Sequence, residues 1–442
     1  MLERLFHLKE SGTDIKTESI AGITTFLTLS YIIFVQPAVL GAAGMDQGAV
    51  FVATCVSAAV GTLLMAFLAN YPIALAPAMG HNFYFSYIVV LTLGYTWQVA
   101  LGAVFVAGVL FILLSAVGLR EALVNNIPGC LKNGIPVGIG LLIALVGLEW
   151  SGIVVSHPVT YVTLGDLTST PTALSLFGLV VISSLIALRF KGAILAGFIL
   201  TTVVGLFIGL VEYKGIINTP PSIDPTLFKL EIPNIIAYPN FITVIIIFFF
   251  LDLFDSIGTL IGVTQQAGIM KDDKLPKAKE CLLSDAVATS AGAVLGTSSV
   301  TAYIESAAGI SVGGKTGLTN VVTALLMILA LFFSPLVQMV GSGYQVSEKV
   351  TLYPVIAPAL IIVGSFMFKS ITRIDWNDYT ESIPAFLTII MMPLSFSITE
   401  GISMGLISYV LLKLVTGKGK TVHWLIYTFA LLFIARYIFI SN

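Results

Sequence analysis

Two acidic residues, Asp252 and Asp255, interrupt an apolar stretch that is long enough to cross a membrane. The stretch reads FFFLDLFDSIGTLIGVT and covers Phe248–Thr264. Residues three positions apart lie on one face of a helix, so the two carboxylates point the same way. An ionised carboxylate at bilayer depth costs about 3 kcal/mol and faces protein or a water-filled cavity. We expect them to bind substrate N–H groups or a transported proton; neutral carboxyls bonded to neighbouring Ser and Thr are the structural alternative.

A third acidic residue, Glu305, lies in the segment GTSSVTAYIESAAGISVGG, which is rich in small and β-branched residues before it becomes helical. Glu305 should therefore begin a half-helix at membrane depth, where free N–H groups favour an ionised carboxylate and a bound ligand. A structural salt bridge is the alternative, but no Lys or Arg falls near the middle of a predicted span. Tyr303, in the extended piece, is the preferred residue for stacking on a flat ligand.

The segment YPIALAPAMGHNFYFSY is also unable to form one continuous helix, because Pro72, Pro77 and Gly80 interrupt it. Asn82 begins its helical part and follows His81. A helix cap is the structural alternative for Asn82, and structural and functional roles are equally open for His81. The aromatic run that follows suits either ligand stacking or packing.

The composition is that of a polytopic membrane protein. Of the 442 residues, 57% are hydrophobic and 10% are charged, whereas a soluble domain has about 25% charged residues. Three widely spaced cysteines suit apolar packing better than a disulfide or metal framework. We find no phosphate-binding loop, metal cluster or Ser-His-Asp set, so we expect no cofactor, no metal, no nucleic-acid partner and no enzyme activity. The N-terminus lacks the features of a cleaved signal peptide.

Hydropathy predicts about fourteen membrane spans. They are 18–43, 48–69, 73–92, 97–117, 131–150, 172–189, 192–212, 240–263, 282–297, 299–313, 317–338, 350–369, 382–398 and 400–416. A cytoplasmic N-terminus places most of the 21 Lys and Arg on the inner side and only Lys214, Lys229 and Lys349 outside. Arg436 stays unassigned, because residues 422–439 form a further apolar segment that either crosses the membrane or lies in the interface.

The fourteen spans divide into two sets of seven. Because seven is odd, the second copy of the repeat must insert upside down. The third and tenth spans, at matching positions, are the two interrupted ones. Irregular backbone at membrane depth survives only where it is buried or lines a cavity. Paired interrupted segments are therefore expected to mark the binding site of a transporter.

The chain resembles the AzgA-like purine permeases, the adenine/guanine/hypoxanthine branch of the nucleobase–cation symporters in the uracil/xanthine permease superfamily. The resemblance rests on GITTFLTLSYIIFVQP, YPIALAPAMGHNFYFSY, LKNGIPVGIGLLIALVGL, LDLFDSIGTLIGV, GTSSVTAYIESAAGISVGGKTGLTNVV and ESIPAFLTIIMMPLSFSITEGISMGLISYVLLKL. It implies an all-α fold of fourteen spans in 7+7 inverted repeats, with short strands in broken spans 3 and 10. It also implies a core domain of residues 18–117 and 240–338, and a gate domain of residues 131–212 and 350–416.

The resemblance places substrate-binding residues on spans 3, 8 and 10. The matching positions are Asn82, Asp252, Asp255, Thr259 and Glu305. Family members usually have Gly at position 78 and a small residue at position 83, where this chain has Ala and Phe. These departures affect the wall formed by span 3 and leave substrate preference open.

We therefore expect a cell-membrane transporter that imports adenine, guanine or hypoxanthine by proton symport, with alternating access of core against gate. Asp255 or Asp252 and Glu305 would bind the base and carry the proton, while Tyr303 and Asn82 would complete the site. An anion carrier on the same fold, a transporter of uracil or xanthine, a channel and a membrane enzyme are the alternatives. A homodimer is left open.

Overall fold

The computed structural model describes residues 2–117, 128–232, 241–266, 276–347 and 350–439. Several charges that support the predicted topology lie outside these residues, namely Arg120, Lys271, Lys274 and Lys349. The chain forms two compact units, one of Met1–Ala116 with Gly147–Leu360 and one of Val117–Val146 with Ile361–Asn442. These boundaries are not those of the predicted core and gate domains, a division that stays a prediction.

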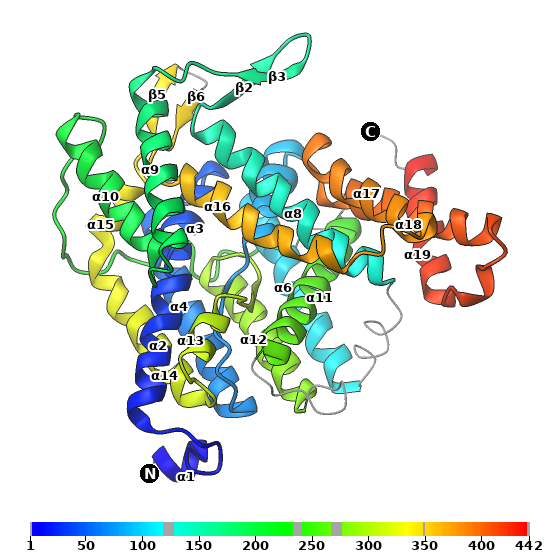
Figure 1. The fold of residues 1–442 in the computed structure, drawn as a ribbon, viewed down its shortest axis with the longest axis horizontal. Helices are drawn as coiled ribbons and strands as arrows, with labels where there is room; N and C mark the ends of the chain where they lie inside the picture. Colours follow the sequence, from blue (N-terminus) through cyan, green and yellow to red (C-terminus); the bar gives the residue numbers. More distant parts are fainter. Residues whose placement is uncertain (1, 118–127, 233–240, 267–275, 348–349, 440–442) are drawn as a thin grey trace. The chain divides into compact units, whose positions relative to one another are not determined.

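The first unit is a helical assembly with three short two-stranded sheets (Figure 1). Its first half contains α1 (Leu2–Phe6), α2 (Ile15–Leu29), α3 (Ile32–Ala42), α4 (Gln47–Leu64), η1 (Met65–Ala69), β1 (Leu75–Pro77), α5 (Met79–Phe83), η2 (Tyr84–Thr92), α6 (Trp97–Val117), the end of α8 (Gly129–Trp150), β2 (Val154–His157), β3 (Tyr161–Leu164), α9 (Thr170–Ala187) and α10 (Ala193–Phe207). Its second half contains α11 (Phe241–Gln266), α12 (Ala278–Leu295), β4 (Val300–Ala302), α13 (Ser306–Ser311), α14 (Gly317–Ala330), η3 (Leu331–Phe333), α15 (Ser334–Val340), β5 (Tyr344–Ser347), β6 (Val350–Leu352) and the start of α16 (Ala357–Met367).

The second unit consists of the remaining parts of α8 and α16 with the C-terminal helices. These are η4 (Phe368–Arg373), α17 (Tyr379–Leu394), α18 (Ile398–Val415), η5 (Gly419–Thr421) and α19 (Trp424–Phe439). Helices α17 and α18 pack closely because α18 carries glycine where they meet: a Cβ at Gly405 would lie 1.8 Å from the Thr388 hydroxyl. Lys413 of α18 forms an ion pair with Glu381 of α17 at 2.7 Å.

Seven of the described helical segments are long and apolar enough to cross a membrane, and four shorter helices are also apolar. The boundaries follow the predicted spans with local differences. The first span is divided into α2 and α3 at Ser30–Tyr31, and the twelfth begins with strand β6 before α16. The C-terminal apolar segment is helical, as α19.

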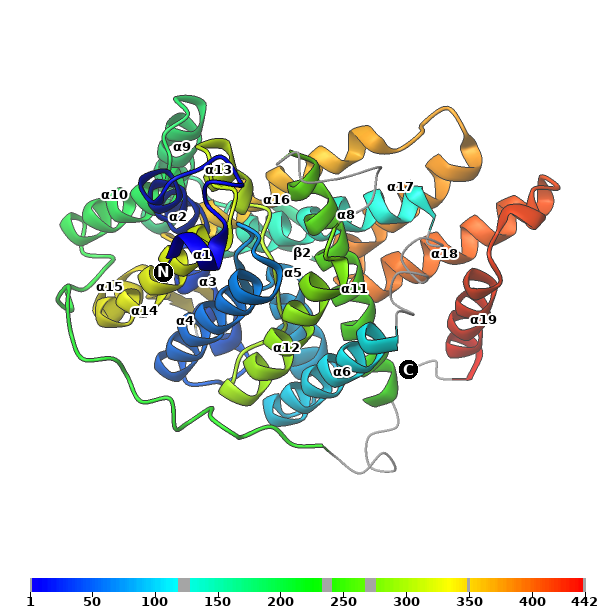
Figure 2. The ribbon, with the colours of Figure 1, turned by 90° about the horizontal axis from the view of Figure 1, so that it is seen from below.

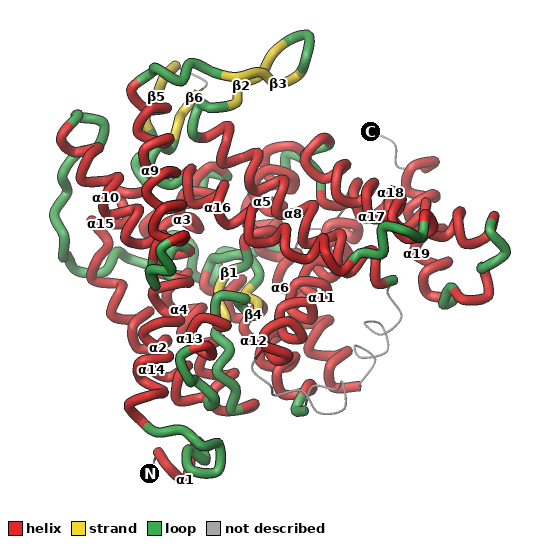
Figure 3. The backbone as a smooth tube through the Cα atoms, viewed as in Figure 1, coloured by secondary structure: helices red, strands yellow, loops and turns green. Residues whose placement is uncertain are grey.

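The predicted short strands of spans 3 and 10 are confirmed. Strands β1 and β4 pair antiparallel, with Leu75 opposite Ala302 and Pro77 opposite Val300, and lie among the surrounding helices (Figure 3). Helix α5 follows β1, and α13 follows β4 after a short turn. The first residues of the two strands are 225 positions apart in the chain. The two broken spans therefore meet by strand pairing.

Two threonines hold the strands in the same way. The Thr62 hydroxyl of α4 donates to the Leu75 carbonyl at 2.9 Å and accepts from the Leu75 N–H at 3.0 Å. The Thr289 hydroxyl of α12 makes the same pair of bonds with Val300, at 2.9 and 3.2 Å. Leu75 and Val300 are the first residues of their strands. Helices α4 and α12, which also contact each other (Figure 2), thus play matching roles, as a repeated architecture requires.

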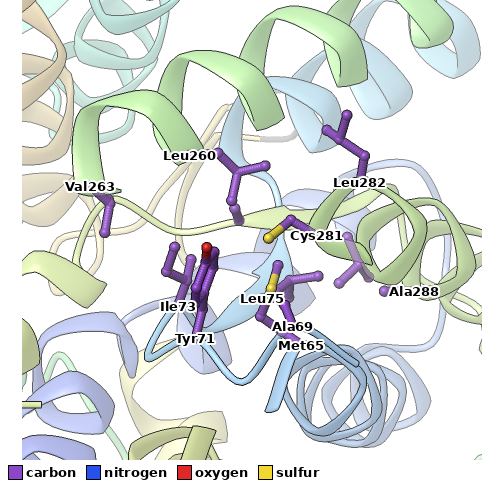
Figure 4. Close-up of a cluster of buried hydrophobic side chains, with 12 residues drawn as sticks. Met65, Ala69, Tyr71, Ile73, Leu75, Leu260, Val263, Cys281, Leu282 and Ala288 are labelled. Carbon is purple, nitrogen blue, oxygen red and sulfur yellow. The ribbon is translucent and has the colours of Figure 1, made fainter. Parts of the chain in front are cut away.

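An apolar cluster packs against the paired strands β1 and β4 (Figure 4). Its buried members come from η1, β1, β4, α11 and α12, and include Met65, Leu75, Leu260, Val263, Cys281, Leu282 and Val300. Because these side chains have almost no exposed area, the cluster holds α11 against the paired strands. The position of the acidic face of α11 is thereby set.

Candidate functional site

The predicted site residues come together in the first unit, around the β1–β4 pair. Asp252, Asp255 and Thr259 lie on α11, and His81 and Asn82 lie on α5. Helix α11 contacts both α5 and β4. The pairing of two broken spans therefore brings together the acids of the eighth span and the residues that follow each strand.

Asp252 is fully buried and pairs with His81. Its Oδ1 lies 2.8 Å from His81 Nε2, and neither side chain has more than 2% of its area exposed. A buried carboxylate needs a partner to offset its desolvation, and this imidazole supplies it. The sequence left open whether His81 was structural or functional; the structure makes it the direct partner of an intramembrane acid.

Asp255 has a different environment, although it lies one turn further along the same helix. Its side chain is 30% exposed, and its Oδ2 lies 4.0 Å from His81 Nδ1. The Thr301 hydroxyl of β4 donates to the same oxygen at 2.9 Å. Asp255 is thus oriented by strand β4, and its side chain remains partly exposed.

Glu305 immediately precedes α13, as predicted for the start of a half-helix, and it is partly exposed. The Tyr31 hydroxyl donates to its Oε1 at 2.7 Å. Tyr31 lies at the point where α2 ends and α3 begins, so a break in the first span places this phenol beside the tenth. Among the described residues, the side chain bonded to Glu305 is the phenol of Tyr31, and the functional role of Glu305 stays a prediction.

Asn82 does not cap the short helix, because α5 begins at Met79 with Ala78 as its N-cap. Its amide nitrogen donates to Gln36 Oε1 at 2.7 Å, and Gln36 in turn donates to Thr297 and Ser298 at 2.8 and 2.9 Å. Asn82 Oδ1 is buried and has no hydrogen-bond partner among the described residues. The amide oxygen is thus an unpaired acceptor in the interior, and because the side chain is fully buried it is not exposed to a ligand in this structure.

Tyr303 and the aromatic residues after Asn82 are mostly used for packing. Tyr303 is 5% exposed, and its hydroxyl donates to the Pro77 carbonyl at 2.5 Å. Its ring lies 6.4 Å from that of Tyr31, so the two phenols stand side by side next to Glu305.

Phe83 is 2% exposed and stacks on Tyr87. Thr259 is partly exposed on α11.

Three features of the site were not recognised in the sequence. Tyr31 and Gln36 lie in a span that looks continuous, and only their polarity within an apolar run marks them. Asp285 of α12 is 1% exposed and accepts a 2.6 Å hydrogen bond from Ser256 of α11. It pairs with the polar face of α11 from a neighbouring helix, and an acid within a predicted span is the signal that could have found it.

Together these groups can bind a small planar molecule that has N–H donors. Asp255 and Glu305 are partly exposed carboxylates, whereas the amide oxygen of Asn82 is unpaired but buried. Each of the three is oriented by a neighbour: Thr301, Tyr31 and Gln36, respectively. The geometry favours acceptance of hydrogen bonds, because the groups that face the site are mainly acceptors.

The chain matches the permease family Xan_ur_permease over residues 16–425. It is 46% identical to the adenine permease AdeP of Escherichia coli strain K12, over 100% of this chain and 97% of AdeP. It is 43% identical to the guanine/hypoxanthine permease PbuG of Bacillus subtilis strain 168, with complete coverage of both.

Among solved structures, the fold matches the transmembrane domain of the cyanobacterial bicarbonate transporter BicA. The TM-score is 0.66 at 14% identity, and the match covers 89% of this chain and 97% of that domain. The predicted transporter fold is therefore confirmed, and with it a multi-pass membrane protein that is not an enzyme. On the extent and identity of these matches, the chain belongs to the Xan_ur_permease family of permeases.

Proposed function

We propose that this permease transports purine nucleobases, with adenine, guanine and hypoxanthine as the candidate substrates. The relatives at 43 to 46% identity are an adenine permease and a guanine/hypoxanthine permease, which points to these bases. The site itself supports the same class, because a purine presents N–H groups and the carboxylates of Asp255 and Glu305 accept hydrogen bonds.

The observation that carries the proposal is the pair of partly exposed carboxylates, Asp255 and Glu305, that lie beside strand β4. Asp255 belongs to α11 and Glu305 follows β4, yet Thr301 of β4 holds Asp255. A base bound between them would donate N–H groups to both. Charge-assisted hydrogen bonds of this kind contribute about 1.5–3 kcal/mol each.

The coupling ion in this proposal is the proton. Two carboxylates at membrane depth carry a large desolvation cost when both are ionised. Protonation of one as the base binds would lower that cost and link the two events. Asp252 is an unsuitable contact for the base, because it is fully buried against His81. We assign to it the role of holding α5 and α11 together.

Alternating access by movement of core against gate completes the proposed mechanism, with the N-terminus in the cytoplasm. An anion carrier on the same fold is the competing function, because BicA shares the fold. Anion binding requires a basic or N–H-rich site. Within the described residues, the side chains hydrogen-bonded to Asp255 and Glu305 are Thr and Tyr. The basic neighbour of Asp255, His81, is already paired with Asp252, so the acidic character of the site favours the nucleobase.

The test is uptake of radiolabelled adenine, guanine and hypoxanthine by cells that lack their own purine carriers. Glu305→Gln and Asp255→Asn remove one negative charge each and preserve shape, so uptake should fall by at least tenfold in both. Glu149→Gln, at the exposed end of α8, is the matched acid-to-amide control and should transport normally. Full transport by both site variants would refute the assignment, and uptake of uracil, xanthine or bicarbonate alone would point to the alternatives.

A further inference from the structure

We infer that α19 crosses the membrane as an additional span, so that the C-terminus lies on the side where α18 begins. Sequence analysis left this segment undecided between a crossing and an interfacial helix. The contacts between α18 and α19, both in the second unit, favour the crossing.

The two helices meet at both ends, with opposite chain direction. In η5, which follows the end of α18, the Gly419 carbonyl accepts a hydrogen bond from the Tyr427 hydroxyl of α19 at 3.0 Å. Ten residues later, the Tyr437 hydroxyl lies 2.6 Å from the Ser403 hydroxyl and also donates to Glu400, in the first turn of α18. Helix α19 thus returns along α18 to the level at which α18 starts.

The distribution of charge agrees with this path. The connection between the helices carries Lys418 and Lys420, which suits a cytoplasmic loop. At the other end, Arg436 is not free: its guanidinium lies 2.8 Å from Glu400. With Arg436 at that end and both Lys418 and Lys420 in the connection, the bias of Lys and Arg still places the connection on the inner side.

The outer face of α19 fits the acyl chains of a bilayer. Ile426, Ala430 and Phe433 are buried at helical spacing, whereas the opposite face exposes the apolar side chains of Trp424, Leu431, Leu432 and Ile438. The 16 residues of α19 extend about 24 Å at 1.5 Å per residue, which is shorter than the ~30 Å hydrocarbon core but equal to the length of α17, one of the predicted spans. An interfacial helix would instead show a strongly polar face.

Cysteine labelling in intact cells tests the crossing. The full-length protein receives Lys420→Cys, a cysteine appended after Asn442, or Val159→Cys in the exposed β2–β3 turn as the reporter of the outer side. The native Cys55, Cys130 and Cys281 are buried and should not react with a membrane-impermeant maleimide. We expect the appended cysteine and Val159→Cys to react in intact cells, and Lys420→Cys to react only after permeabilisation.

The outcome does not depend on transport or on the absolute orientation. Opposite sidedness of Lys420→Cys and the appended cysteine supports the crossing, whichever of them is outside; the same sidedness overturns it. Leu432→Cys should remain unlabelled even after permeabilisation, because lipid covers it. Its labelling would overturn the assignment of this face to lipid, and so would efficient oxidative cross-linking of two Leu432→Cys chains, which would place a second copy there.

Discussion

Asp252 and Asp255 lie three residues apart on α11, yet the structure predicts that their loss has different consequences. Asp252 is fully buried with His81 at 2.8 Å, and breaking a buried ion pair costs about 3–5 kcal/mol. Asp252→Asn should therefore lower folding stability strongly. Asp255 is 30% exposed and accepts a hydrogen bond from the Thr301 hydroxyl. The side-chain oxygen of an asparagine can accept the same hydrogen bond. We expect Asp255→Asn to cost less than about 1 kcal/mol in stability.

Binding should show the reverse order. If Asp255 accepts an N–H of the base, its conversion to an amide loses about 1.5–3 kcal/mol of charge-assisted bonding, or about 10- to 150-fold in Kd. The assay is thermal unfolding and calorimetric titration of adenine and hypoxanthine on the same purified proteins. His81→Gln is the matched variant for the pair and should resemble Asp252→Asn. This division of roles would be refuted if the Asp252→Asn protein were stable but did not bind the bases, and the Asp255→Asn protein bound them normally.

Three further outcomes are expected. Tyr31→Phe removes the hydroxyl that donates to Glu305 at 2.7 Å and should weaken base binding about tenfold with little change in melting temperature; unchanged affinity would show that the phenol does not position the acid. Gly309→Ala places a methyl group 2.0 Å from a threonine hydroxyl of α2 and should cost about 1–3 kcal/mol of stability, whereas equal melting temperatures would contradict the packing. Hydrogen bonds from Thr380 lower the pKa of Asp378 to about 2 from 3.8. Its stabilising contribution is therefore present above pH 4 and lost as the pH falls toward 2, so Asp378→Asn should flatten the melting temperature in that range, and an unchanged profile would count against it.

Much of the site was predictable because charge within an apolar span is costly. Asp252, Asp255 and Glu305 stand out against their surroundings, and Pro and β-branched residues mark the broken third and tenth spans. These signals are local and depend only on composition and spacing. The short strands in these spans were expected from the resemblance, but their pairing, with Leu75 opposite Ala302, was not predicted.

The partners of these residues could not be predicted in the same way. Tyr31 reaches Glu305 across 274 positions, and Gln36 reaches Asn82 across 46. Such contacts depend on where helices cross, which periodicity does not encode. The difference in burial between Asp252 and Asp255 likewise depends on where α5 lies against α11, so spacing alone placed the two acids on one face and could not separate their roles.

The most direct test of the account is purine accumulation by purified protein in liposomes with an imposed pH gradient. An inward proton gradient should drive saturable uptake of radiolabelled adenine, guanine or hypoxanthine above equilibrium, and a protonophore should abolish it. Glu305→Gln should remove the gradient-driven accumulation in the same membranes. Uptake that stops at equilibrium, or is indifferent to the gradient and to Glu305, would contradict proton-coupled purine transport by this site.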